Sequence, residues 1–89
     1  MRNTISSFYG ILIYIYMEKG TQHKLPHVHA LFAENDMAID FESNILAGNL
    51  PKKQKKLVEA WVLLHEDELK ASWKAYTEHG ELIKIKGLE

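Results

Sequence analysis

An α+β fold is predicted for this chain, with an antiparallel β-meander of three to four strands followed by two packed C-terminal α-helices. Two observations predict it: apolar residues alternate with a period of two in the first half of the sequence, and recur with helical spacing in the second. Pro51, which suits the first position of a helix, stands where the period changes. We expect one domain over residues 1–89, with a meander at 8–48, a helical part at 51–79 and a C-terminal tail or short strand at 81–89.

The strands are predicted from short β-branched and aromatic runs bounded by turn residues. Residues 1–7 are polar and are expected to be a lead-in, so that the first strand is the run Ile11–Tyr16. Because both faces of that run are apolar or aromatic, it should lie in the centre of the sheet or at an oligomer interface. Further strands are expected at 27–33, 37–42 and 45–47, with turns at Glu34-Asn35-Asp36 and Ser43-Asn44.

The helical half is predicted from an amphipathic stripe whose apolar side chains should face the sheet, namely Leu57, Val58, Trp61, Leu64 and His65. The acidic run Glu66-Asp67-Glu68 should interrupt it and begin a second helix, because negative charge is favourable in a first turn. Leu69, Trp73 and Tyr76 continue the apolar face there, and Gly80 is a typical residue for ending a helix.

Composition narrows the functional class. The 89 residues are 46% hydrophobic, contain no cysteine and carry a formal net charge of −1. Such a balance gives no general attraction to nucleic acid or membranes, and the absence of cysteine is typical of a cytoplasmic protein. The apolar run at 10–17 is too short to span a bilayer, which takes about 20 residues, and it lacks the flanks of a signal peptide. We therefore expect a small cytoplasmic protein that gains stability from an oligomer or a partner.

Histidines provide the strongest functional signal, because three of the five lie within seven residues around Pro26. Residues two apart on a strand share a face, so His27 and His29 should point the same way, and His23 can approach them from the preceding turn. Three imidazoles suit zinc or another divalent transition metal, and Asp40 on the next strand is a candidate fourth ligand. We therefore predict a candidate metal site formed by His23, His27, His29 and Asp40.

Two other roles for the same histidines are open. Without a metal, His27 and His29 are candidate catalytic residues, acting as general base and acid on a phosphodiester in a ribonuclease. Alternatively, they only satisfy hydrogen bonds to the backbone and to Asp40, and hold the start of the strand in place.

A basic cluster occupies the start of the predicted first helix: Lys52, Lys53, Lys55 and Lys56. Positive charge is unfavourable at a helix N-terminus, so the cluster suggests a negatively charged partner such as nucleic acid or an acidic protein surface. A solvated helix face is the simpler explanation.

Several motifs together resemble one family. These are Phe8-Tyr9-Gly10-Ile11, then His23-x-x-Pro26-His27-x-His29-Ala30, then Leu50-Pro51 ahead of a helix that carries Trp61, with Trp73 beyond. In this combination the sequence resembles the bacterial family called domain of unknown function 4160, over nearly its whole length. Relatives commonly carry an acidic residue before the first histidine, where this chain has Gln22.

The resemblance implies a genomic arrangement more than a reaction. Members of the family have no established activity, are often encoded beside a second small family, and have been suggested to form toxin–antitoxin pairs with it. The resemblance thus implies one component of a two-protein module that acts by binding a small neighbour-encoded protein. The alternative is a histidine-dependent nuclease or metal-dependent hydrolase centred on His23, His27 and His29, and a homo-oligomer is compatible with both.

Overall fold

A five-stranded antiparallel sheet forms the base of the molecule in the computed structural model, which describes residues 3–15 and 25–89. The strands follow one another in space as they do in the sequence: β1 (Asn3–Phe8), β2 (Ile11–Ile15), β3 (His27–Phe32), β4 (Asn35–Asp40) and β5 (Ile45–Gly48). The predicted α+β meander is therefore present, but the expectation of three to four strands was wrong.

The additional strand is β1, which lies in the polar stretch expected to be a lead-in. It pairs with β2 from Asn3 opposite Ile15 to Phe8 opposite Ile11. Tyr9 and Gly10, with φ of 48° and 76°, form the two-residue turn between them, as the right-handed twist of a hairpin favours. Although β1 is largely polar, its apolar side chains are buried, so pairing and packing decide its conformation.

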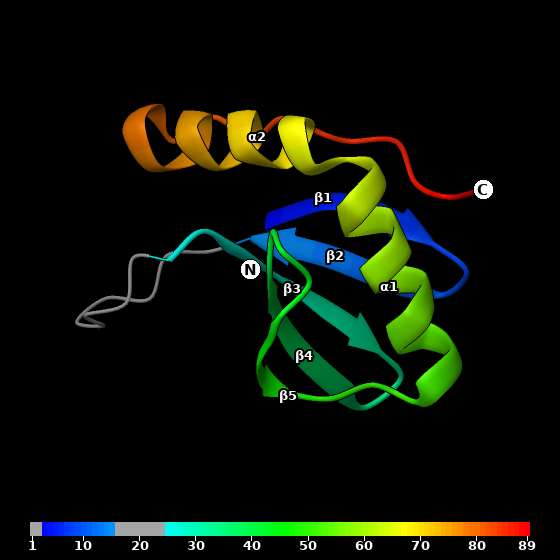
Figure 1. Ribbon diagram of the computed structural model, residues 1–89. Helices are drawn as coiled ribbons and strands as arrows, with labels where there is room; N and C mark the ends of the chain where they lie inside the picture. Colours follow the sequence, from blue (N-terminus) through cyan, green and yellow to red (C-terminus); the bar gives the residue numbers. More distant parts are fainter. Residues whose placement is uncertain (1–2, 16–24) are drawn as a thin grey trace.

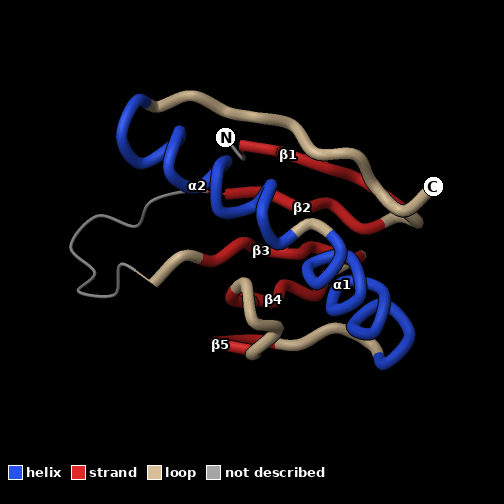
Figure 2. Tube along the Cα trace, turned by 45° about the horizontal axis from the view of Figure 1, so that its top comes forward, coloured by secondary structure: helices blue, strands red, loops and turns tan. Residues whose placement is uncertain are grey.

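The two predicted C-terminal helices are α1 (Lys52–Leu64) and α2 (Glu66–His79), and the chain bends between them at His65. Both helices cover the same face of the sheet (Figures 1 and 2). Gly80 ends α2 as predicted, in the left-handed conformation with φ of 68°, and its N–H donates to the carbonyl of Tyr76 at 2.9 Å. Within the described residues, no helix is long and apolar enough to cross a membrane.

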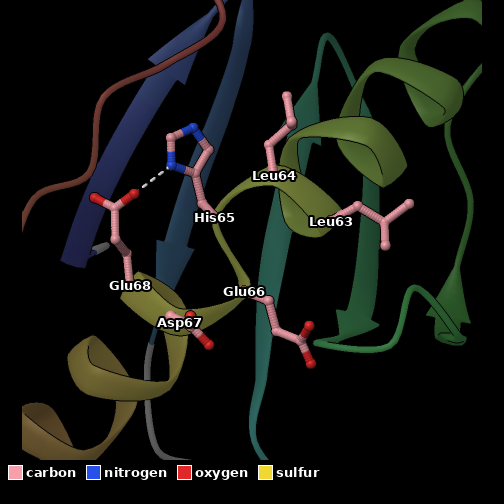
Figure 3. A pocket seen from close by; sticks show the side chains of 6 residues that line it. All are labelled: Leu63, Leu64, His65, Glu66, Asp67 and Glu68. Atoms are coloured by element: carbon pink, nitrogen blue, oxygen red, sulfur yellow. Dashed lines mark hydrogen bonds and ion pairs between the residues drawn. The ribbon is translucent and has the colours of Figure 1, made fainter.

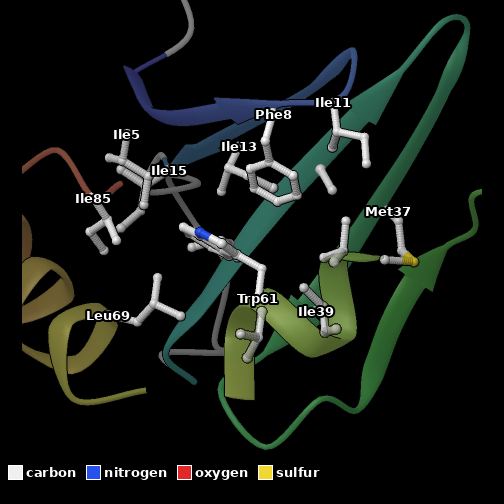
Figure 4. Packing of buried hydrophobic residues seen from close by; sticks show 14 of the residues in the cluster. Ile5, Phe8, Ile11, Ile13, Ile15, Met37, Ile39, Trp61, Leu69 and Ile85 are labelled. Carbon is white, nitrogen blue, oxygen red and sulfur yellow. The ribbon is translucent and has the colours of Figure 1, made fainter. Parts of the chain in front are cut away.

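Trp61 of α1 is the centre of the hydrophobic core (Figure 4). Its ring is completely buried and lies 5.4 Å from that of Phe8, centroid to centroid, while its indole N–H donates to the carbonyl of Lys86 at 2.9 Å. The rest of the core comes from both helices and from one face of the sheet, including Ile13, Ile15, Val28, Ala30, Met37, Ile39, Val58, Val62 and Leu69.

Residues 81–89 form an ordered tail beside β1, and not a further strand (Figure 2). The backbone N–H of buried Ile85 donates to the carbonyl of Ile5 at 2.8 Å, and the Ser72 hydroxyl donates to the carbonyl of Ile83 at 3.1 Å. The tail thus lies against the outer edge of β1, where an unpaired strand edge is otherwise open to association with other chains.

Candidate functional site

The face of the sheet opposite the helices carries the predicted histidines. Because side chains alternate along a strand, Val28 and Ala30 enter the core while His29 points away from it. The strand register then sets Tyr14 and Ala38 on either side of His29. We call this open face of the sheet, which carries Tyr14, His27, His29 and Asp36, the histidine face.

His29 is held by the carboxylate of Asp36, which is not among the predicted site residues. Its Nδ1 lies 3.3 Å from a carboxylate oxygen of Asp36, and the Tyr14 hydroxyl donates to the other oxygen. The Tyr14 ring also stacks on the imidazole, with centroids 5.1 Å apart. The His29 side chain is only 9% exposed and its Nε2 is buried, whereas the Asp36 side chain is 41% exposed. The carboxylate therefore orients the imidazole and still meets solvent.

Asp36 was missed because the turn before it was placed incorrectly. The turn consists of Ala33, with φ of 54°, and Glu34, and it does not extend through Asp36 as expected. Asp36 is already a strand residue, opposite Leu31, and so reaches the same face as His29. A two-residue turn at Ala33 and Glu34 fixes the register between β3 and β4, and assuming such a turn would have predicted that Asp36 shares a face with His29.

His27 shares the histidine face, as the two-residue spacing predicted. Its ring centroid is 5.1 Å from that of His29, and 5.4 Å from that of Trp73 in α2, because His27 lies at the end of the sheet where α2 passes. Its Nδ1 lies 2.8 Å from the carbonyl of Leu25. A carbonyl only accepts, so Nδ1 carries the hydrogen and the neutral ring keeps its lone pair on Nε2.

Asp40 lies opposite His27, as expected, but its carboxylate serves the turn after β4. It accepts from the backbone N–H groups of Glu42 and Asn44 at 2.9 and 2.8 Å, and from the Asn44 side chain at 3.1 Å. Burial by itself would raise the pKa of Asp40, but these hydrogen bonds outweigh it and hold the pKa below its ordinary value. Its oxygens therefore already have partners.

The candidate metal site is only partly within the described residues, because His23 lies outside them. Among residues 3–15 and 25–89, no three histidine, aspartate or glutamate side chains are arranged to hold a metal ion. The metal set of His23, His27, His29 and Asp40 stays a prediction.

The lysine cluster lies apart from the histidines. Lys52 begins α1 four residues after Gly48, which pairs with Met37 in the first half of β4, whereas His27 pairs with Asp40, the last residue of β4. No acidic residue lies in the first turn of α1, so the positive charge there is not offset locally. The four lysines are thus poorly placed to hold a phosphate at the histidine face.

The outward face of α1 also carries two exposed leucines near its C-terminal end, which was not expected (Figure 3). The predicted core stripe included Leu64, which is instead 71% exposed beside Leu63 at 67%, while Val62 takes the buried position. An open hollow of about 310 Å³ lies at this bend, lined by both leucines and by residues 65–68. His65, at the end of the helix, has its Nδ1 2.5 Å from a Glu68 oxygen.

Comparison with known proteins gives one match. The model of a family described as a domain of unknown function, DUF4160, matches residues 10–74, which include β2 to β5, α1 and His23, His27 and His29. The chain belongs to this family, as the proline–histidine motif suggested. No curated protein and no solved structure matches the chain.

Proposed function

We propose that this DUF4160 member is a cytoplasmic, protein-binding component of a two-protein, toxin–antitoxin-like module, and that its partner binds the histidine face. The observation that carries the proposal is an apolar pair, Leu12 and Leu31, directly opposite each other on neighbouring strands of the face that the helices leave open. Both are only half-buried. An antiparallel sheet with one solvated face normally alternates apolar with polar residues, so leucines there favour a binding surface.

The surroundings of the leucine pair suggest the chemistry of the partner. Asp36 lies opposite Leu31, and its carboxylate is partly exposed. A small protein that presents apolar side chains with a lysine or arginine beside them would complement both features. We therefore propose the small neighbour-encoded protein as the occupant, with a basic residue at the edge of its contact surface.

Co-purification tests this proposal. The chain would be expressed together with the product of the adjacent small gene, and the two proteins should elute as one complex. Leu31→Glu should abolish the complex, because it replaces an apolar contact with a charge that the partner's apolar side chains would bury without a counterion. Leu64→Glu, a charge of the same kind on the helix side, is the matched control and should leave the complex intact. The proposal would be refuted if the wild-type chain eluted at the same volume with and without the neighbour-encoded protein. It would also be refuted if Leu31→Glu and Leu64→Glu reduced the complex equally.

Growth assays test the toxin–antitoxin aspect separately. Expression of one component alone should arrest growth, and co-expression should restore it. When the Leu31→Glu variant replaces the wild-type chain in the co-expressed pair, growth should no longer be restored. Normal growth in every combination would refute the toxin–antitoxin role, while formation of the protein complex would still be judged by co-purification.

A second candidate function is a histidine-dependent nuclease or metal-dependent hydrolase, which the pairing of His29 with Asp36 favours. In such an enzyme, His27 would exchange protons with the substrate through its Nε2. The more buried His29 would hold the imidazole of His27 in position. Bound zinc, held with the help of His23, would supply an activated water. Metal analysis of the untagged protein, together with RNA cleavage by wild type, His27→Ala and His29→Ala, tests this. Absence of both metal and cleavage would refute it.

A further inference from the structure

The outer stripe of α1 carries opposite charges at its two ends. This stripe, which we define as Lys53, Lys56, Ala60, Leu63 and Leu64, is exposed along its length and lies opposite the buried Val58, Trp61 and Val62. Exposed Asp67 follows at the bend into α2 (Figure 3). One end of the stripe is thus basic, the other is apolar and acidic, and the small Ala60 lies between them.

We propose that two copies of the chain associate through this stripe, with their α1 helices antiparallel and a two-fold axis at Ala60. Lys53 lies seven positions before Ala60 and Asp67 seven after it. In an antiparallel pair, Lys53 of one copy lies about 10 Å from the axis at 1.5 Å per residue. It therefore lies beyond the C-terminal end of the partner's α1 at Leu64, beside the bend that carries Asp67. Lys56 and Leu64, four positions from Ala60, also meet, so the lysine stem covers the leucine.

The charges that would meet are those without partners in a single copy. Within the described residues, neither Lys53 nor Asp67 forms an ion pair, whereas the two neighbours of Asp67 do: Glu66 lies 3.2 Å from Lys70 and Glu68 lies 2.5 Å from His65. A carboxylate from a second copy would also offset the positive charge at the N-terminus of α1.

The symmetry of the charges favours a second copy over another protein. A two-fold interface joins the same patch on both subunits, so it requires a patch that is complementary to itself. The outer stripe with Asp67 meets this requirement, because its basic half matches its acidic half when reversed. Ala60 at the centre allows the helices to approach closely. The histidine face remains free in this dimer, because it lies on the other side of the sheet.

Sedimentation velocity over a range of protein concentrations tests the dimer. The wild type should change from monomer to dimer as concentration rises, with weaker association at high salt. Lys53→Glu and Asp67→Lys should each weaken self-association about tenfold, because two symmetric attractions become repulsions. Circular dichroism would confirm that both variants are folded.

Mixing the two variants gives the decisive result. In a mixed dimer, Glu at position 53 of one copy faces Lys at position 67 of the other, and Lys53 faces Asp67 in the second contact. The mixture should therefore associate like the wild type although neither variant does so alone. A wild type that stays monomeric, or a mixture no stronger than its components, would overturn the proposal. Leu31→Glu should still dimerise, which separates this outcome from loss of the neighbour-encoded partner.

Discussion

The two faces of the sheet are built in different ways. On the helix side, the side chains of Ile13, Val28, Ala30 and Ile39 are completely buried beneath Trp61 and its neighbours. On the histidine face, polar groups lie among apolar ones: Asp36 accepts from the Tyr14 hydroxyl, the His29 Nδ1 lies beside Asp36, and the His27 Nδ1 lies beside the carbonyl of Leu25. The first face supplies most of the stability through apolar burial, while the second combines order with accessible chemistry.

This difference suggests where changes are tolerated. A small domain has little stability in excess, so a defect on the helix side should unfold the chain. A defect on the histidine face should remove less stability and act more on binding. The largest loss of stability is therefore expected at the centre of the helix side, and the smallest on the histidine face.

The largest effect is expected at the centre of the helix side. Trp61→Ala removes a completely buried ring and its hydrogen bond to the tail, and should lower the free energy of unfolding by about 3–5 kcal/mol. Urea denaturation followed by circular dichroism would measure this. Leu64→Ala, on the exposed side of the same helix, is the control and should change stability by no more than about 0.5 kcal/mol. Similar losses in both variants would contradict the assigned core.

A second large effect is expected where β5 approaches the histidine face. Gly48 has φ of 69°, and a Cβ there would lie 2.1 Å from the backbone oxygen of Asp36. Gly80 has nearly the same φ, but a Cβ there meets nothing within 4 Å. Gly80→Ala should therefore cost only the conformational strain of about 1–2 kcal/mol. Gly48→Ala should cost about 1–3 kcal/mol more, because backbone must move. Equal losses in thermal or urea unfolding would show that β5 adapts freely.

Asp40 gives an intermediate, pH-dependent effect. Asp40→Ala leaves the turn donors without their acceptor and should cost about 1–3 kcal/mol at pH 7. Because the pKa of Asp40 is lower in the folded protein than its ordinary value of 3.8, its contribution is complete above that value. The contribution is lost as the pH falls through the folded-state pKa. The difference in unfolding free energy between wild type and Asp40→Ala should therefore shrink at low pH. A difference independent of pH would contradict the role of the ionised carboxylate.

The sequence was sufficient for the features that depend on local pattern. The α+β class, both helices, the stop at Gly80 and the shared face of His27 and His29 all follow from periodicity or from a single residue's conformational preference. Leu64 was misplaced because several apolar residues near the end of α1 fit more than one helical stripe. Packing of Val62 against the sheet decides between them.

The features that were missed depend on contacts between distant segments. The polar strand β1 is held by pairing with β2 and by the tail, whose Ile85 lies far from Ile5 in the sequence. Asp36 joins His29 only because Ala33 adopts a left-handed conformation, which the residue type does not favour. Asp40 faced His27 as expected, yet its hydrogen bonds go to the following turn. Register and turn type, more than residue type, therefore determine the composition of the candidate site.

The smallest effect is expected from Tyr14→Phe, which removes only the hydroxyl that donates to Asp36. Water can replace this donor because the Asp36 side chain is partly exposed, so the loss should be about 0.5–1.5 kcal/mol in urea denaturation. Tyr9→Phe, at an exposed turn, is the matched control and should have no measurable effect. Binding of the neighbour-encoded protein to both variants would complete the test. Weaker binding by Tyr14→Phe alone would show that the partner requires Asp36 in its observed orientation. Unchanged binding with reduced stability would assign the Tyr14–Asp36–His29 network to the architecture of the face, and the leucine pair alone would then carry recognition.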